Sequence, residues 1–172
     1  MPSPWEEVRD FFHYCDNYID PVDRAAERFA RDLTKSNTAL DAAISHLKIS
    51  QIEVQFQDDR GLRSFDASTG VLTLSSRADR SSQAFQALHQ IALITQNDLL
   101  EATLDLARLQ SDEARAIAKI GLANYFAGAA LLPYDAFLEA AQKTRHDLER
   151  LADLFGASIE QVAHRLSTVQ RP

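Results

Sequence analysis

The side chain best placed to do chemistry is a histidine within a helical stretch. His89 has Phe85 four residues before it and Leu93 four residues after it, so all three share one helix face. An imidazole in such a position can ligate a metal, transfer a proton or contact a bound molecule. One imidazole alone cannot hold a metal ion. On spacing alone we therefore favour a core histidine that is hydrogen-bonded to a carbonyl or a water.

A second stretch, residues 121–137, is apolar on nearly every side. This pattern is typical of a helix buried in the middle of a fold. Asn124 and Tyr125 are its polar exceptions, and we expect the Tyr125 hydroxyl to reach a hydrogen-bond partner. The sequence contains no GxSxG, Walker or GxGxxG motif, so no further catalytic site is indicated.

Helices are expected on both sides of a short strand segment. The apolar periods predict helices over residues 4–14, over a stretch that Asp20 caps, and over residues 38–47, 81–96, 112–132 and 158–169. Ser111 precedes the long fifth helix as its cap, and Pro133 ends it because proline cannot continue the hydrogen-bond ladder. Ser158 with Gln161 three residues later forms a capping box for the last helix.

The strand segment lies between these helices. Apolar and polar residues alternate strictly over residues 51–57, which predicts a half-buried strand. Residues 62–65 and 71–74 are two further short runs, each preceded by a turn sequence. We predict a small three-stranded antiparallel meander packed on the His89 helix. The fold class is α+β, mostly helical, with a helical C-terminal part.

Composition limits the possible functions. The chain has 172 residues, 45% of them hydrophobic, which suits one domain over residues 1–172. Cys15 is the only cysteine, so a disulfide framework and a Cys-rich metal site are excluded. No apolar run is long enough to span a bilayer, and we expect a cytoplasmic protein without a membrane partner. The net charge of −7 without a basic cluster argues against duplex DNA binding by these residues.

The order of these motifs resembles the ImmA/IrrE-type metallopeptidases. The resemblance rests on the strand segment, the His89 helix and the later LANYFAGAALLPY helix. In that family HExxH supplies two zinc ligands and a general base, and a Glu before AN supplies the third ligand. The match puts Gln90 at the base position, Leu93 at the second ligand and Leu122 at the third. It implies a non-enzymatic domain without catalytic residues or metal, because leucine cannot ligate zinc and glutamine cannot deprotonate water.

A narrower resemblance, over most of the chain, is to the central domain of the short-chain fatty-acyl transcriptional regulators. It rests on LANYFAGAALLPY, on Arg145-His146-Asp147 and on the closing HRLSTVQRP. It implies a bacterial regulator with an N-terminal Cro/CI-type helix-turn-helix and a Cys-rich C-terminal part, neither of which is in this sequence. We therefore expect an excised sensing domain for CoA or acyl-CoA, in a homodimer whose DNA contacts lie in a domain outside this chain.

The resemblance also predicts where an acyl-CoA is held. Without zinc, the cleft becomes an apolar pocket with a few polar groups. Its lining is expected from Phe85, Leu93, Leu122 and Tyr125, with His89 and Gln90 as polar contacts. Four arginines are candidates for the CoA phosphates: Arg77, Arg80, Arg145 and Arg165. For each arginine, a solvated charge or a local salt bridge is the alternative interpretation.

Two other functions stay open at this point. One is an active zinc peptidase with displaced ligands, which stoichiometric zinc lost on mutation of His89 would support. The other is a dimerisation or docking module in which leucines have collapsed the pocket. The aromatic residues near the N-terminus, from Trp5 to Tyr18, are compatible with this second alternative.

Overall fold

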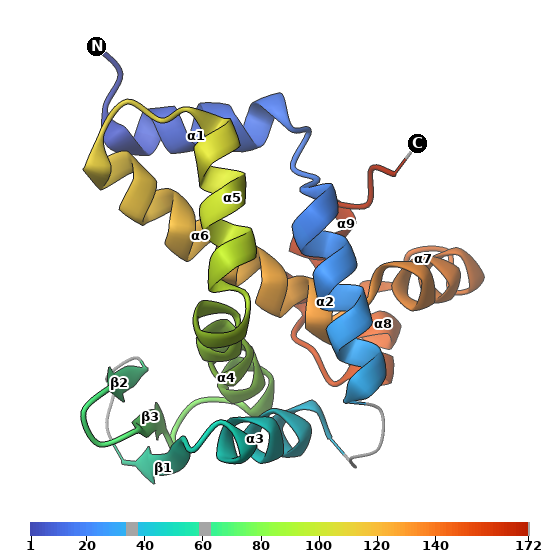
Figure 1. The fold of residues 1–172 in the computed structure, drawn as a ribbon. Helices are drawn as coiled ribbons and strands as arrows, with labels where there is room; N and C mark the ends of the chain where they lie inside the picture. The colour runs from blue at the N-terminus through green and yellow to red at the C-terminus, as the bar shows by residue number, and fades with distance from the viewer. Residues whose placement is uncertain (34–37, 59–62, 172) are drawn as a thin grey trace.

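The computed structural model describes residues 1–33, 38–58 and 63–171 and confirms a mostly helical α+β fold (Figure 1). In chain order the elements are α1 (Pro4–Tyr14), α2 (Asp20–Asp32), α3 (Ala39–Ile49), β1 (Glu53–Gln57), β2 (Ser64–Asp66), β3 (Val71–Ser75), α4 (Arg80–Thr95), α5 (Asn97–Ala107), α6 (Asp112–Leu131), α7 (Tyr134–Lys143), α8 (Leu148–Phe155) and α9 (Ile159–Leu166). The predicted helices are present, with ends that differ by a few residues.

Helix α6 runs through the middle of the molecule and packs against α1, α2, α4 and α5 (Figure 1). Its composition explains this position, because small and apolar side chains on every side let several helices approach. Ala118, Leu122 and Phe126 are fully buried on it. The helix ends at Leu131, two residues before Pro133, as the proline predicts.

The sheet differs from the predicted antiparallel meander. Its strand order is β1-β3-β2, with β1 parallel to β3 and β2 antiparallel to β3. The chain therefore crosses from one edge to the other before β3 enters between them. The physical reason lies in the strand compositions: Leu72 and Leu74 of β3 are buried, whereas β1 and β2 have no buried residue. The most apolar strand takes the centre, and the turn sequences alone did not show this.

Two predicted helix caps are confirmed, and a third is wrong. Ser111 Oγ accepts from the backbone N–H of Ala114, and Ser158 with Gln161 forms the capping box. Asp20 is instead the first residue of α2, and its carboxylate accepts from the Tyr18 hydroxyl at 2.7 Å. Asp20 already lies within the helix, so Ile19 is the N-cap residue, and the Asp20 carboxylate bonds the side chains of Tyr18 and Arg24.

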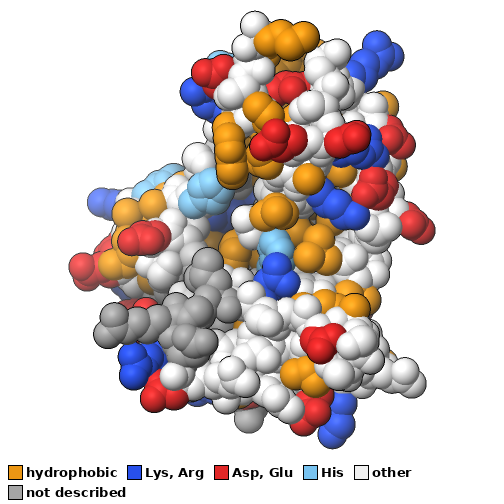
Figure 2. Space-filling view, turned by 90° about the vertical axis from the view of Figure 1, so that its left-hand side faces the viewer, with side chains coloured by type: hydrophobic (Ala, Val, Ile, Leu, Met, Phe, Trp, Pro, Cys, Tyr) orange, Lys and Arg blue, Asp and Glu red, His pale blue; other side chains and the backbone are white. Residues whose placement is uncertain are grey.

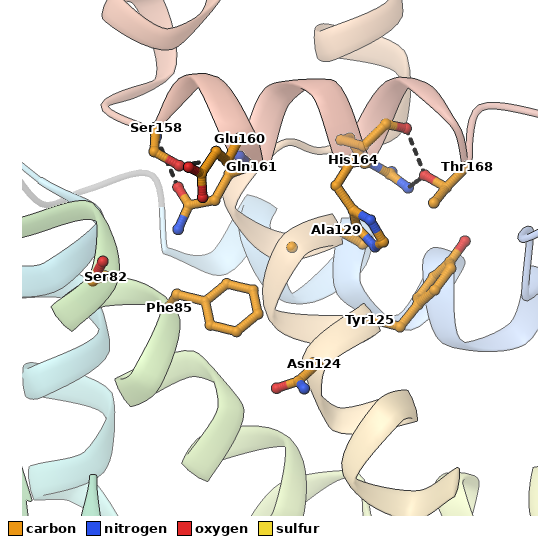
Figure 3. A pocket seen from close by; sticks show the side chains of 12 residues that line it. Ser82, Phe85, Asn124, Tyr125, Ala129, Ser158, Glu160, Gln161, His164 and Thr168 are labelled. Carbon is orange, nitrogen blue, oxygen red and sulfur yellow. Dashed lines mark hydrogen bonds between the residues drawn. The ribbon is translucent and has the colours of Figure 1, made fainter. Parts of the chain in front are cut away.

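Three helices meet where the chain folds back on itself. α4 and α6 lie next to each other, and α9, drawn above both in Figure 3, packs against α6. One bond that ties α9 to α4 is Gln161 Nε2 donating to the Ser81 carbonyl at 3.3 Å. Within the part of the chain described, no single helix is long and apolar enough to cross a membrane; α6 and α7 meet that test only as a pair bent by 58°.

Candidate functional site

His89 lies on α4 with a defined hydrogen-bond partner. Its side chain is 3% exposed, and Nδ1 is 2.7 Å from Oδ1 of Asn124 on α6. Because an amide oxygen can only accept, the proton is on Nδ1 and the imidazole donates. The hydrogen-bond partner of His89 is thus a side-chain amide from the neighbouring helix. From the sequence alone, a backbone carbonyl or a water was predicted.

The second ring nitrogen of His89 has a different environment. Nε2 is buried and has no hydrogen-bond partner among the described residues. Burial and the positive charge of Arg63 hold the pKa of His89 below its usual value, and the bond to Asn124 offsets them only in part. The imidazole is therefore neutral near pH 7, with a lone pair at Nε2.

Gln90, at the position that the resemblance assigns to the family's general base, is hydrogen-bonded to the side chain of Arg63. Its side chain is 3% exposed, and Oε1 accepts a hydrogen bond from Nη1 of Arg63. Burial lowers the pKa of the Arg63 guanidinium, which still remains charged at neutral pH. A fixed positive charge near His89 opposes the binding of a second cation at the same place.

The residues present do not fit a catalytic zinc. Leu122 is fully buried and Leu93 packs against the core, and neither side chain has a donor atom. Among residues 1–33, 38–58 and 63–171, no group of three His, Cys, Asp or Glu side chains is arranged to hold a metal ion. A catalytic zinc needs three protein ligands and a water, and of the three family positions only His89 has a ligand side chain.

A pocket of about 290 Å³ lies between α4, α6 and α9, and we call it the α4–α6–α9 pocket (Figure 3). Its lining residues are Ser82, Phe85, Asn124, Tyr125, Gly128, Ala129, Ser158, Glu160, Gln161, His164, Arg165 and Thr168. Figure 2 shows one face of the molecule hollowed near its centre, where hydrophobic, histidine and Lys or Arg side chains meet. Asn124 both lines the pocket and bonds His89, so the imidazole lies directly behind the pocket wall.

The α6 wall of the pocket follows helix geometry. Asn124, Tyr125, Gly128 and Ala129 are spaced by one and four residues, which puts them on one face. Two of the four are small, and this leaves room beside Phe85. A Cβ atom built on Gly128 would be 3.9 Å from the Phe85 ring, an ordinary van der Waals contact, so the backbone alone does not close the pocket.

One end of the pocket is a buried ionic network. Asp23 of α2 is fully buried and pairs with Arg165 through two bonds, of 2.6 and 3.0 Å. The Tyr125 hydroxyl donates to Asp23 Oδ2 at 2.6 Å and accepts from the Ile19 N–H at 3.1 Å. Burial and the Asp23 charge raise the pKa of Tyr125, so this hydroxyl remains protonated.

The network continues into the C-terminal segment. Arg171 contacts Asp23 at 3.3 Å and Glu27 at 3.4 Å, and its guanidinium lies 3.8 Å from the Tyr134 ring centre. Its backbone N–H also donates to the Tyr134 hydroxyl at 2.7 Å. Two arginines from the end of the chain are therefore anchored on α2, more than 140 residues away.

The structure brings only part of the predicted site together. Phe85, Tyr125 and Arg165 line the α4–α6–α9 pocket, and His89 lies behind Asn124. The other predicted residues do not line it; among them are three from α4 and α6, Gln90, Leu93 and Leu122. Gln90 is buried and bonds Arg63, Leu122 is fully buried in the core, and Leu93 packs against that core.

The four predicted arginines lie in different places. Arg77 is exposed and pairs with Asp58. Arg80 is exposed at the start of α4 and lines a different cavity, next to Phe155. Arg145 is exposed between α7 and α8, with a φ of 54°. Arg165 is 3% exposed, and its donors go to Asp23, Thr168 and the Leu132 carbonyl, which leaves little capacity for a phosphate.

Sequence reasoning missed several residues of this region. Arg63 follows a turn and nothing in its neighbourhood distinguishes it from a surface arginine. Asn124 was noted as a polar exception, but its bond to His89 depends on the pairing of α4 with α6. The sequence did contain one signal for the pocket. Gly128 and Ala129 are small, and Gly128 lies four residues after Asn124 and so on the same helix face, where small side chains leave space.

Comparison with known proteins supports a regulatory family. The chain is 66% identical over 171 residues to a "Propionyl-CoA carboxylase regulator" of Cereibacter sphaeroides, covering 99% of this chain and 37% of that protein. It is 42% identical over 176 residues to the "HTH-type transcriptional regulator PrpR" of Mycobacterium tuberculosis, covering 99% of this chain and 36% of that protein. The chain thus spans little more than a third of the length of these curated relatives.

A solved structure and a family model agree with this result. A chain described as a "Mycobacterium tuberculosis transcriptional regulator" superposes with a TM-score of 0.94 at 42% identity, covering 99% of this chain and 53% of that one. The model of the IrrE N-terminal-like domain (Peptidase_M78) matches residues 44–167, which is most of the chain and includes the strands, His89 and α6. The chain therefore belongs to the IrrE N-terminal-like domain family.

Proposed function

We propose that this chain is the effector-binding domain of a bacterial transcriptional regulator and that its effector is CoA or a short-chain acyl-CoA. The observation that carries the proposal is the α4–α6–α9 pocket, which lies beside His89, while the other two positions that the family resemblance assigns to zinc ligands are leucines. The name of the relative from Cereibacter sphaeroides, a regulator of a propionyl-CoA enzyme, supports the choice of ligand.

The size of the pocket limits which part of the ligand it takes. Ligand pockets commonly have volumes of about 300–1,000 Å³, so 290 Å³ is at the small end. Phe85, Gly128 and Ala129 suit a short alkyl group, and Asn124 and Ser82 offer polar contacts for a thioester or amide. The nucleotide of CoA then lies outside the pocket. The exposed arginines Arg77, Arg80 and Arg145 remain the candidates for its phosphates.

The same proposal assigns no peptidase activity to the domain. We expect purified protein to contain no stoichiometric zinc, and we expect the His89→Ala variant to have the same metal content as the wild type. Elemental analysis of protein purified without chelators tests this. Zinc near one equivalent that is lost in His89→Ala would show that a displaced-ligand metal site exists, and the receptor function would have to be abandoned.

We further propose that DNA contact belongs to another part of the regulator, which acts in the cytoplasm as a homodimer. The net charge of −7 supports a separate DNA-binding region, because DNA affinity comes largely from Lys and Arg contacts to phosphates. Light scattering after size exclusion measures the oligomeric state of this chain alone. A monomer would place the dimer contacts elsewhere in the regulator.

Isothermal titration with propionyl-CoA, acetyl-CoA and CoA tests the ligand. We expect binding, and we expect ligand at 100 times its Kd to raise the free energy of unfolding by about 2.7 kcal/mol. The Gly128→Leu variant should fill the pocket and abolish binding, while Ala116→Leu on an exposed face of α6 is the matched control. Wild-type protein that binds none of the three compounds would contradict the proposal.

A further inference from the structure

The side-chain amide of Asn124, on the α6 wall of the pocket, is held in one orientation. Asn124 Oδ1 accepts from His89 Nδ1 at 2.7 Å, so the oxygen end of this amide faces α4. Asn124 is exposed at the edge of the pocket, and no hydrogen bond within the described residues uses the two donors of its NH₂ end. An amide with one end fixed and the other open to solvent at a pocket edge offers a donor to a group that is held at that edge.

His89 is suited to keep this orientation. Its Nε2 is buried and unpartnered among the described residues, and a second proton there would put an unpaired charged N–H in the interior. The N–H at Nδ1 of the ring points at the Asn124 oxygen. Turning the amide over would bring its NH₂ group against that N–H, donor against donor. The imidazole therefore specifies which end of Asn124 is presented.

The surroundings indicate what kind of acceptor fits. Phe85 and Gly128 line the same pocket, and Figure 3 shows Asn124 at its lower edge, below the Phe85 and Tyr125 side chains. Glu160 also lines the pocket, and its negative charge disfavours a carboxylate or phosphate there. A neutral carbonyl oxygen attached to a short alkyl group satisfies the donor and the apolar wall together.

Resting on the proposed function, we infer that Asn124 donates an N–H to the thioester carbonyl of the acyl-CoA, with His89 as its positioning residue. CoA itself has a thiol in place of the thioester, and sulfur is a weak acceptor. The pocket would then distinguish acylated from free CoA by one hydrogen bond, which is worth about tenfold in affinity.

The test is the ratio of two dissociation constants, for CoA and for propionyl-CoA, measured by titration of the 172-residue chain. We expect a ratio of about ten for the wild type. Asn124→Asp keeps an acceptor for His89 Nδ1 at nearly the same volume but has no donor, so the ratio should fall to about one. His89→Phe should lower the ratio, and His89→Asn, which can place an N–H where Nδ1 lies, should restore it.

The outcomes separate this inference from the function on which it rests. If the wild type binds neither compound, the proposed function fails. If it binds both and Asn124→Asp leaves the ratio unchanged, the function stands and the inference is overturned. Should Asn124→Asp not fold, the infrared carbonyl band of ¹³C-labelled propionyl-CoA decides: a shift to lower frequency on binding wild type supports the inference, and an unshifted band refutes it.

Discussion

At the scale of residues, the buried charges have the largest consequences for stability. Asp23 is fully buried and Arg165 nearly so, yet each finds several partners: the guanidinium, a tyrosine hydroxyl, a threonine hydroxyl and a backbone carbonyl. Taking two charges out of water is costly, and the pair is tolerable only because its hydrogen-bonding groups are used. The same pair connects the pocket wall on α9 to α2.

Removing one partner of this pair should be strongly destabilising. We expect Asp23→Asn to lower the free energy of unfolding by about 3–5 kcal/mol, because it leaves Arg165 buried without its counter-charge. Urea unfolding followed by circular dichroism measures the effect. Glu139→Gln, in the exposed pair with Lys143, is the control and should leave stability nearly unchanged. Equal effects at both sites would show that the Asp23 network contributes little.

At the scale of elements, the mixed sheet depends on a tight connection before its central strand. Gly70 precedes β3 with a φ of 68°, and its carbonyl accepts from the Glu53 N–H at 2.8 Å, where β1 begins. A Cβ at this position would lie 2.9 Å from the Gln51 carbonyl oxygen. The glycine therefore lets β1 and β3 start side by side, which is what the parallel pairing requires.

Two glycines with similar backbone angles allow a matched experiment. Gly70→Ala meets both the left-handed strain and the clash with Gln51, whereas Gly156 has a φ of 63° and open space where a Cβ would lie. We expect Gly156→Ala to cost about 1 kcal/mol and Gly70→Ala to cost clearly more. Thermal or urea unfolding compares them. Equal losses of unfolding free energy in the two variants would show that the contact with the Gln51 carbonyl oxygen adds no cost at Gly70.

At the scale of the whole molecule, the pocket is a product of three segments that are far apart in the chain. α4, α6 and α9 contribute its walls, and α2 holds its end in place through Asp23. The C-terminal segment returns to α2 through Arg171, so both α9 and the segment after it are tied to α2.

Global stability should depend on pH through two histidines. Burial lowers the pKa of both His89 and His46 in the folded chain, so the unfolded chain takes up protons first as the pH falls below about 6.5. We expect the free energy of unfolding to decrease from pH 7.5 to pH 5.5. In urea titrations, His89→Asn and His46→Asn should each remove part of this decrease. A pH profile that neither of these variants changes would contradict the assignment.

Much of the fold was predictable because its signals are local. The period of apolar residues placed the helices, Ser111 and Ser158 marked two helix starts, and Pro133 marked the end of α6. At Leu93 and Leu122, the positions that the family resemblance assigns to zinc ligands, the residue type is likewise read directly from the sequence, and a side chain without a donor atom cannot ligate metal in any fold. Residue type and short-range spacing carry this information.

The pocket and the sheet order were decided only by tertiary structure. Arg165 has the same side chain as Arg77 or Arg80, and it becomes buried because α9 lies across α6 and meets Asp23 there, 142 residues away in sequence. Asn124 gains its role from the packing of α4 against α6, and β1 pairs with β3 because the chain crosses over first. Such contacts depend on which distant surfaces bury each other, and no local pattern encodes that choice.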